Sequence, residues 1–478
     1  MHIILCDTRK LDVSKDFAGG MGVGLFPAGG GLRGWIIRHG YRRDRRPVAL
    51  LFAHLAAIFR QQGHQVEYCE DRPAGRADLY VFCPALVTLH VERQAMTQIL
   101  EDHPHARILV VGTVASVLPE AFSAPGVTVV KGEAEQLLWK LDEVLQRPDA
   151  TVQLGTLDDL DRLPWADWSL FGPHRFRIGY DFWRFPTAFV EASRGCTHKC
   201  SYCPDIVLEN TARFRDPDAV AAEIRSGIER WGFRSFKFRD PLFGLDRLAT
   251  YRLAELLGKL PVPIQFSVET RIDLLRPELL RVLRRVGLTS VTVGIETPDA
   301  ETLRQHRRIP VDDDRQRDFI ALCRGMGIRT VASFMIGFPG DTVEAVKSVC
   351  AYAIALGPTF ANFNIVTPYP GTELFRQLQG RIADFDFSHY SAYTPLLQYD
   401  HLTPEKLRSL HQWCARRFYF RWDYLGDNLH LLWPSLQKIG LGREKPVSGG
   451  DAAHPFPPKP LGTANSLRKK GFRQDRPH

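Results

Sequence analysis

Short apolar runs alternate with helical patterns along two stretches of this chain. Strands that alternate with helices pair in parallel, because each helix returns the chain to the edge of the sheet where the previous strand began. A chain of 478 residues also exceeds one ordinary hydrophobic core, so two α/β domains are expected. The expected strands are 3–6, 65–69, 79–84, 108–112 and 127–130 in the first stretch, and 188–192, 235–238, 264–268, 290–294, 329–336 and 362–366 in the second.

The residues that follow each expected strand are the candidates for a ligand site. Both a doubly wound sheet and a partial (β/α) barrel bind ligands at the carboxyl ends of their strands. Glycines there let the backbone approach a bulky ligand, and the helix after Gly132 offers free N–H groups. The candidates are Thr88, Gly112, Thr113, Gly132 and Glu133 in the first stretch, and Cys196, Asp240, Arg271, Glu296, Gly337 and Pro339 in the second.

Three of the nine cysteines stand together as Cys-x3-Cys-x2-Cys, at Cys196, Cys200 and Cys203. Three thiolates on a short loop can hold three irons of a four-iron, four-sulfur cluster and leave the fourth iron to a non-protein ligand. Two alternatives stay open: a zinc site completed by His198, or three buried thiols. Zinc sites usually show paired Cys-x2-Cys or His spacings, which favours the cluster. The remaining cysteines are expected to be free and buried.

The segment Arg194-Gly195-Cys196-Thr197-His198-Lys199-Cys200-Ser201-Tyr202-Cys203-Pro204 resembles the motif of radical SAM enzymes. In that family the open iron binds S-adenosylmethionine, and reductive cleavage gives a 5'-deoxyadenosyl radical. The segments FRDPLF, ETRIDLL, GIET, MIGFPGDT and TPYPGTEL are similar to those of cobalamin-associated members. The resemblance implies a [4Fe-4S] cluster on Cys196, Cys200 and Cys203, with S-adenosylmethionine contacted by Tyr202, Asp240, Arg271, Glu296, Gly337 and Pro339.

Within that site the resemblance places Tyr202 at the adenine, Glu296 at the ribose or methionine part, and Arg271 at the carboxylate. Each residue also has a plainer interpretation. Glu296 could cap the next helix, because acids favour the first turn. Arg271 could pair with Asp273 or Glu269. Gly337 and Pro339 could simply form a tight turn.

A second resemblance covers the first stretch, where LAAIFRQQGHQVEYCE, ADLYVFCPALVT, ILVVGTVASVLPE and VTVVKGEAEQLL look like the Rossmann-like cobalamin-binding domain of such enzymes. It implies cobalamin contacts from Thr88, Gly112, Thr113, Gly132 and Glu133. The sequence departs from the family at Thr113, where a second glycine is usual, and at Ala134, within a usual Gly-Glu-Gly-Glu. It lacks Asp-x-His-x-x-Gly, so no histidine ligand to cobalt is expected. A module with a different cofactor, or none, stays an alternative.

Together these patterns predict an α/β protein in five parts. Residues 1–153 form a Rossmann-like, doubly wound cobalamin-binding domain, and 154–178 a linker docked by Trp165 and Trp168. Residues 179–380 form a partial (β/α)6 TIM-like barrel. Residues 381–440 form a helical cap, in which Tyr390 and Tyr393 are candidate substrate contacts, and 441–478 a disordered basic tail. The glycine-rich segment 17–31 is either an ordered loop over the cobalamin or substrate face or a plain solvent loop.

The formal net charge of +8 comes from two segments, 33–46 and 441–478, each net +5, which leaves about −2 for the rest. No basic face for nucleic acid is therefore expected, although the arginines of 33–46 could meet an anionic substrate or phosphate. The start of the chain lacks the pattern of a signal peptide, and the longest apolar stretch, 48–59, is too short to span a bilayer. A cytoplasmic location is expected.

The resemblance implies an enzyme that uses a [4Fe-4S] cluster, S-adenosylmethionine and cobalamin. The leading hypothesis is methylation of an unactivated carbon of a small-molecule biosynthetic intermediate. Two alternatives remain: cyclisation, rearrangement or oxidation without methyl transfer, and a non-catalytic cluster or cobalamin sensor. The implied partners are a small-molecule substrate and an electron donor such as flavodoxin or ferredoxin.

Overall fold

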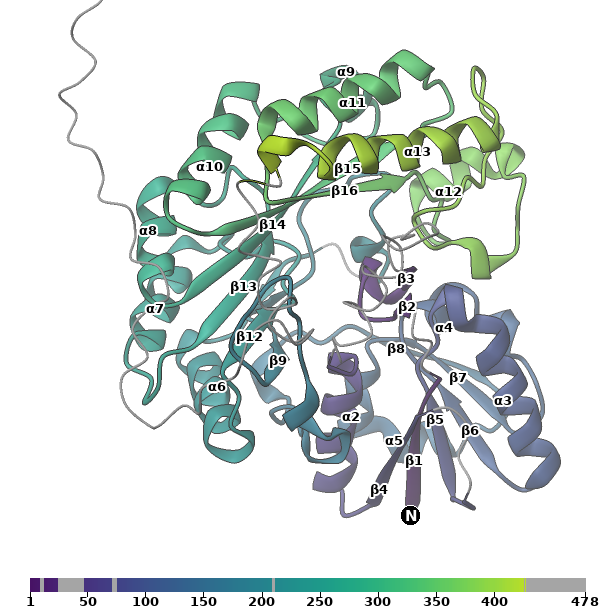
Figure 1. Ribbon diagram of the computed structural model, residues 1–478. Helices are drawn as coiled ribbons and strands as arrows, with labels where there is room; N and C mark the ends of the chain where they lie inside the picture. The colour runs from purple at the N-terminus through teal and green to yellow at the C-terminus, as the bar shows by residue number, and fades with distance from the viewer. Residues whose placement is uncertain (9–12, 25–46, 71–74, 209–210, 425, 427–478) are drawn as a thin grey trace, which may run out of the picture. The chain divides into compact units, whose positions relative to one another are not determined.

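Two six-stranded parallel sheets carry the part of the chain that the structure, a computed structural model, describes (Figure 1). Described are residues 1–8, 13–24, 47–70, 75–208, 211–424 and 426. The arginine cluster 33–46, the second half of the glycine-rich segment, the predicted cap helix after residue 421 and the tail 441–478 lie outside them. The alternation of strands and helices predicted for both stretches is confirmed.

The first sheet has the order β4-β1-β5-β6-β7-β8 and is doubly wound. Ile3 and Leu5 pack on one face in the core that holds α2 and α5, and Ile4 and Cys6 pack on the other face with α3 and α4. Its elements are β1 (His2–Asp7), α2 (Leu50–Gln61), β4 (Gln65–Glu70), β5 (Leu79–Phe82), α3 (Leu89–Asp102), β6 (Arg107–Val110), α4 (Thr113–Val117), β7 (Val127–Gly132), α5 (Leu137–Leu145) and β8 (Thr151–Gly155).

Strand β8 is the one strand of this sheet that the sequence analysis did not anticipate. It pairs with β7 and runs across the expected domain boundary at residue 153. Val152 and Leu154 are buried while Thr151 and Gln153 are exposed, which is the alternation of an edge strand with one covered face. The linker therefore starts after a strand that belongs to the sheet.

The second sheet has the order β16-β15-β14-β13-β12-β9 and forms the expected six-stranded partial barrel. Helices cover its outer face (Figure 1). Its strands are β9 (Thr187–Val190), β12 (Ser235–Phe238), β13 (Gln265–Thr270), β14 (Leu288–Glu296), β15 (Arg329–Ile336) and β16 (Phe360–Ile365). Its helices are α6 (Pro217–Trp231), α7 (Arg247–Leu257), α8 (Pro277–Arg285), α9 (Ala300–Gln305), α10 (Asp313–Gly325), α11 (Val343–Leu356) and α12 (Glu373–Leu378).

A lysine lies buried in the second sheet, on β12. Lys237 is 1% exposed, and its Nζ lies 3.1 Å from Asp181 Oδ2 and 3.2 Å from Glu269 Oε1. Burial alone would lower the pKa of Lys237, but the charges of Asp181 and Glu269 raise it above the usual value. The lysine is therefore a cation, held by two carboxylates inside the barrel.

The segment between the two sheets is docked mainly by one of its two tryptophans. Trp168 is buried, and its ring lies 5.9 Å from Phe176 and 6.1 Å from Phe233. These edge-to-face contacts hold the segment on the barrel. Trp165, the second predicted anchor, is 43% exposed and contributes less than expected.

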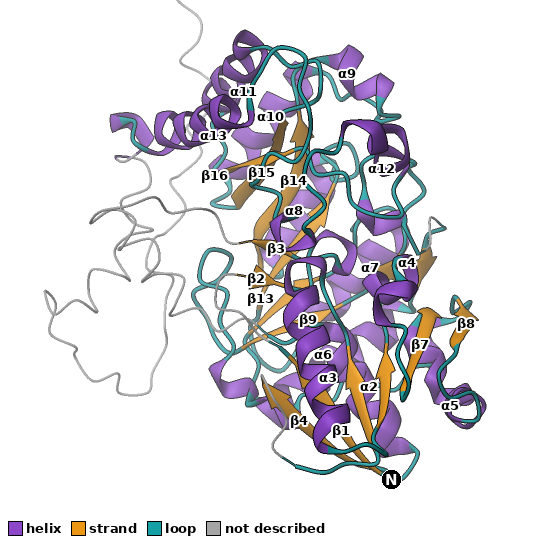
Figure 2. Cartoon of the chain, turned by 90° about the vertical axis from the view of Figure 1, so that its right-hand side faces the viewer, coloured by secondary structure: helices purple, strands orange, loops and turns teal. Residues whose placement is uncertain are grey.

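Helix α13 (Pro404–Tyr419) lies beside α11 and the β16 edge of the barrel (Figure 2). It begins after Thr403, whose hydroxyl accepts from Lys406 N at 3.2 Å, and it has a proline in its first turn. Its side chains reach the backbone of β16. His411 Nε2 donates to Phe363 O at 3.0 Å, and Tyr419 OH both donates to Ala361 O and accepts from Ala361 N.

Helix α13 is expected to lose stability as the pH falls from about 6.5 to about 4. Burial of His411 lowers its pKa in the folded protein to about 4, whereas the unfolded value is 6.5. Between these values the unfolded state binds a proton that the folded state does not, so acid favours unfolding, by about 3 kcal/mol in total. Thermal unfolding followed across this pH range should show the loss.

The matched variant for this prediction is His411→Gln, whose amide can still donate to Phe363 O. In this variant the stability should depend less on pH over the same range, because only the other titrating groups still contribute. An unchanged pH dependence in the variant would show that His411 does not carry the effect.

A search of the described helices finds none that is both long and apolar enough to cross a membrane.

Candidate active site

The cysteine motif lies on the loop that follows β9 and the two-residue strand β10 (Ser193–Arg194). Cys196 and Cys200 are buried, and Cys203 is half-buried. The loop folds tightly because Gly195 adopts φ +83°, and a Cβ there would lie 2.2 Å from Thr211 O. Only glycine fits, so the backbone fixes the first cysteine at the carboxyl end of the barrel.

Burial and local hydrogen bonding act on the thiol of Cys196 in opposite directions. Burial raises the pKa of Cys196, the neighbouring Cys200 raises it further, and a hydrogen bond from His198 N to Cys196 Sγ at 3.3 Å opposes both. Thiolates on one zinc ion converge to Zn–S bonds of about 2.3 Å. Among the described residues no group of three His, Cys, Asp or Glu side chains could hold a metal ion in this way. A cluster differs from a single zinc ion in that each cysteine binds a separate iron.

Tyr202, expected at the adenine, is buried between the cysteines. Its hydroxyl has no hydrogen-bond partner among the described residues. Its ring packs edge-on to His306 at 6.0 Å, and His306 stacks on Phe338 at 4.7 Å. Ser201 Oγ lies 2.8 Å from His306 Nδ1, so the loop after α9 is fastened to the cysteine loop.

Glu296 ends β14 and faces Arg308. Arg308 Nη2 lies 3.5 Å from Glu296 Oε1 and donates to Gly294 O. Burial raises the pKa of Glu296, while Arg308 and Arg271 act against the rise. The capping alternative is wrong, because Asp299 caps α9 and accepts from two backbone N–H groups there. The buried carboxyl of Glu296 is therefore available to the site.

Arg271 makes the ion pair that was its plainer interpretation and keeps one nitrogen unpaired among the described residues. Its Nε donates to Asp273 Oδ1 at 3.0 Å and its Nη2 to Ile309 O at 3.1 Å, so the pairing alternative holds for Asp273. Its Nη1 is buried without a hydrogen-bond partner among the described residues. A buried guanidinium nitrogen without an acceptor suits a carboxylate ligand.

Asp240, Gly337 and Pro339 hold loops together. Asp240 accepts from Ala192 N at 3.0 Å and from Ser193 Oγ at 2.7 Å, and burial raises its pKa to about 7. Gly337 has φ +81° and donates its N–H to Asp341 Oδ2, and the Pro339 carbonyl accepts from Asp400 N. The side chain of Asp240 thus holds in place the backbone that leads into the cysteine loop.

Two of the five residues expected at cobalamin lie at the start of α4, and the other three make contacts within the protein. Gly112 and Thr113 open α4 at the carboxyl end of β6, where Gly112 has φ +94° and Cys83 Sγ lies behind it. Thr88 is fully buried, and its hydroxyl donates to Glu92 Oε2 at 2.9 Å. Gly132 is required by β8 rather than by a ligand, because a Cβ there would lie 2.4 Å from Gly155 O.

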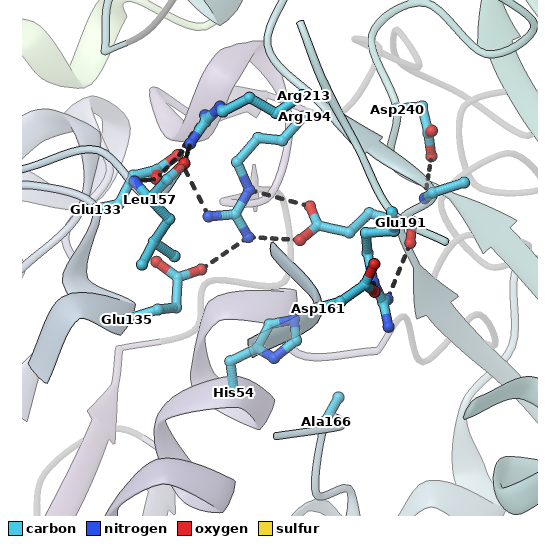
Figure 3. A network of polar contacts seen from close by, with 12 residues as sticks. His54, Glu133, Glu135, Leu157, Asp161, Ala166, Glu191, Arg194, Arg213 and Asp240 are labelled. Carbon is cyan, nitrogen blue, oxygen red and sulfur yellow. Dashed lines mark hydrogen bonds and ion pairs between the residues drawn. The ribbon is translucent and has the colours of Figure 1, made fainter. Parts of the chain in front are cut away.

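Glu133, the fifth of these residues, is bound within the protein. Both of its oxygens accept from Arg213, at 2.8 and 2.7 Å, and Oε2 also accepts from Leu157 N at 2.6 Å (Figure 3). Burial would raise the pKa of Glu133, but the hydrogen bonds from Arg213 and the charge of Arg194 hold it below its usual value. Its carboxylate is ionised and engaged by arginines.

Part of the glycine-rich segment is an ordered strap across the mouth of the barrel. Thr113 Oγ1 donates to Gly19 O at 2.5 Å, and a Cβ on Gly19 would lie 2.5 Å from Pro204 O. Arg239 Nε, at the end of β12, lies 3.0 Å from Asp16 Oδ2. The described part of this segment thus contacts both the α4 end of the first sheet and the cysteine loop.

Several residues of the site escaped the sequence analysis. Arg194, Arg213, Arg239, Arg308 and His306 lie in or beside it, yet only Arg194 and Arg239 belong to recognised motifs. A local signal existed for Arg308, which closes a run of charged residues directly after α9. The partners of the other residues lie far away in sequence, and no spacing reveals them.

Residues 190–353 match the family model of the radical SAM superfamily. Among solved structures, the radical S-adenosylmethionine methyltransferase TsrM from Kitasatospora setae, with cobalamin and a [4Fe-4S] cluster bound, aligns at 16% identity and TM-score 0.57 over 79% of this chain and 77% of that one. The cobalamin-dependent S-adenosylmethionine radical enzyme OxsB aligns at 12% identity and TM-score 0.65, over 92% and 69%. These likenesses confirm the predicted fold class.

Curated relatives include both cyclases and methylases. The anaerobic magnesium-protoporphyrin IX monomethyl ester cyclase of Rubrivivax gelatinosus is 27% identical over 62% of this chain and 57% of its own length. The hopanoid C-2 methylase of Rhodopseudomonas palustris is 24% identical over 66% and 62%. The chain therefore spans less than two thirds of the length of either relative.

Proposed function

Because residues 190–353 form a radical SAM domain, we propose that this chain is a radical SAM enzyme that uses a [4Fe-4S] cluster, S-adenosylmethionine and cobalamin to methylate an unactivated carbon of a small molecule. The observation that carries the proposal is the cysteine loop itself. Cys196, Cys200 and Cys203 lie on one glycine-closed loop, beside two buried polar atoms that the described residues leave without partners, Tyr202 OH and Arg271 Nη1.

The residues around the loop fit the cluster and S-adenosylmethionine. The three thiolates would hold three irons, and the bound cluster supplies the electron that cleaves S-adenosylmethionine to a 5'-deoxyadenosyl radical. Arg271 Nη1 would receive the carboxylate of S-adenosylmethionine. Glu296, beside Arg308, would accept from the ribose hydroxyls or the amino group. Asp240 and Gly337 would contribute indirectly, by holding the loops that surround S-adenosylmethionine.

Cobalamin would lie at the carboxyl end of the first sheet. In doubly wound sheets ligands bind at that edge, and here Gly112 and Thr113 open α4 with backbone N–H groups toward it. Thr113 also contacts the strap that reaches the cysteine loop. A ligand at this edge would therefore sit close to the cluster site. Thr88 and Glu133 would contribute through the structure that they hold.

The other expected partners belong to the same proposal. A radical SAM step requires an external one-electron donor, and a flavodoxin or ferredoxin would serve. Both the substrate and the donor would approach the carboxyl end of the barrel, where the cluster loop lies.

A second candidate function is ring closure or oxidation without methyl transfer. Two of the curated relatives are named as magnesium-protoporphyrin IX monomethyl ester cyclases, at 27% identity. A cyclase would use the same cluster loop and differ in the fate of the substrate radical.

The ratio of two products separates these functions. Methyl transfer consumes one S-adenosylmethionine for the radical and a second as methyl source, so 5'-deoxyadenosine and S-adenosylhomocysteine are expected in equal amounts. Anaerobically reconstituted protein would be incubated with a panel of tetrapyrroles and polycyclic lipids, and both products quantified by mass spectrometry. Only increments above a substrate-free reaction count, because slow abortive cleavage gives 5'-deoxyadenosine alone.

The outcomes point in different directions. 5'-Deoxyadenosine formed with substrate turnover, while S-adenosylhomocysteine stays at background, would overturn the methyltransferase and favour the cyclase. Neither product above background in cluster-loaded protein, across the panel and a cell extract, would favour a non-catalytic sensor.

A further inference from the structure

Arg194 joins the cysteine loop to the first sheet through a buried ion cluster. It stands two residues before Cys196, and its neighbour across the β10–β11 hairpin is Arg213 of β11 (Arg213–Phe214). Both guanidinium groups reach the segment after β7, where Glu133 and Glu135 lie. The contact therefore connects the loop that would hold the iron to the sheet that would hold cobalamin.

The distances show how firmly Arg194 is held. Its Nη2 lies 2.9 Å from Glu135 Oε1, and its Nη1 lies 3.4 Å from Glu133 Oε1. On its other side, Nε donates to Glu191 Oε2 at 3.3 Å and Nη2 to Glu191 Oε1. In Figure 3 the guanidinium lies between the two glutamates of the first sheet and Glu191, which directly follows β9. The planar guanidinium thus meets carboxylates from both sheets at once.

Burial and charge make this contact specific. The side chains of Glu133, Glu135 and Glu191 are 5%, 6% and 9% exposed, and that of Arg194 is 19% exposed. Burial alone would lower the pKa of Arg194, but the three carboxylates raise it well above the usual value. Three carboxylates share two guanidinium groups, so the loss of either guanidinium would leave buried carboxylates without a cation.

We propose that Arg194 is a positioning residue, which fixes the separation of the cluster from cobalamin by docking the cysteine loop on Glu133 and Glu135. This inference rests on the proposed function. Glu133, which was expected at cobalamin, acts instead together with Glu135 as the docking point of the loop. A shift of the guanidinium would move Cys196, two residues away, relative to the edge of the first sheet at Gly112 and Thr113. Such small displacements between reacting groups cost rate steeply.

The test measures that separation in the holoenzyme. With the cluster reduced and the cobalamin in its paramagnetic cobalt(II) form, the two spins interact, and the dipolar part falls with the cube of their distance. Wild-type protein should show one resolved spin–spin splitting by electron paramagnetic resonance. Arg194→Gln and the milder Glu135→Gln should broaden or shift it, with iron and cobalamin content unchanged.

Matched controls separate position from stability. Arg252→Gln breaks an exposed pair in which Arg252 Nη2 lies 2.8 Å from Asp218 Oδ1, and should leave the splitting as in wild type. Arg194→Lys keeps the charge but loses the planar fork, and should keep the wild-type cofactor content while the splitting still differs from wild type. If Arg194→Gln fails to fold, Glu135→Gln and Arg194→Lys carry the test.

Two failures are distinguishable. Wild-type protein that binds no cluster or no cobalamin would overturn the proposed function. Wild-type protein that binds both, with an identical splitting in Arg194→Lys, Glu135→Gln and Arg252→Gln, would overturn the positioning role and leave the proposed function intact.

Discussion

Replacing Cys196, Cys200 and Cys203 together with alanine is expected to abolish iron binding and the visible absorbance of the cluster. In the proposed function these three thiolates hold the cluster, so the triple variant lacks every protein ligand to iron. Iron and sulfide assays after anaerobic reconstitution, with the absorption spectrum, measure the effect. Each single alanine variant should lose most of the cluster, since one iron then lacks its protein ligand.

The control is Cys69→Ala, which removes a half-buried thiol on β4, in the first sheet. It should keep the iron content of wild type. The same circular dichroism spectrum for both proteins would show that the triple variant is folded. Full iron retention in the folded triple variant would refute the cluster assignment.

Lys237→Met should lower the free energy of unfolding of the barrel by about 3–5 kcal/mol, the usual cost of breaking a buried ion pair. The methionine would leave the carboxylate of Asp181, which is fully buried, without its nearest cation. Ser267 Oγ, at 3.3 Å, would remain as a donor to Asp181 but carries no charge. Chemical denaturation followed by circular dichroism would report the loss.

The double variant Lys237→Met, Asp181→Leu tests the cause. When both charges are replaced with apolar groups of similar size, no buried charge is left without a partner, so much of the lost stability should return. Arg252→Met, at an exposed pair, should change stability little. A double variant that is as unstable as Lys237→Met would show that packing, rather than charge, sets the cost.

The strands of the barrel could be predicted because each is a short, mostly apolar run, and these runs alternate with helical patterns along the sequence. For 235–238 and 329–336 the expected limits agree with the observed strands, and for the other four they agree within two residues. The places of Cys196 and Glu296 could also be predicted, since a residue that follows a parallel strand must lie at the carboxyl edge. The motif positions thus depend on local pattern and topology.

Strand β8 and the ion cluster could not be predicted for a different reason. Thr151–Gly155 is short and half polar, so it is indistinguishable from the linker that follows until β7 is placed beside it. Arg194 meets Glu133 and Glu135 across about sixty positions of sequence, and no periodicity encodes such a contact. Glu133 stands where the sequence suggests a ligand contact. Only the folded structure shows that its carboxylate already accepts hydrogen bonds from Arg213.

The hydrogen bonds from α13 to β16 have a consequence for how this protein meets other chains. Strand β16 ends its sheet, and an uncovered outer strand offers free N–H and C=O groups to any extended peptide. Here Tyr419 occupies both groups of Ala361, His411 takes the carbonyl of Phe363, and the carbonyl of Ala392 accepts the N–H of Ile365. At each of these three alternate positions at least one backbone group is thus already occupied, which disfavours the addition of a further strand at the β16 edge.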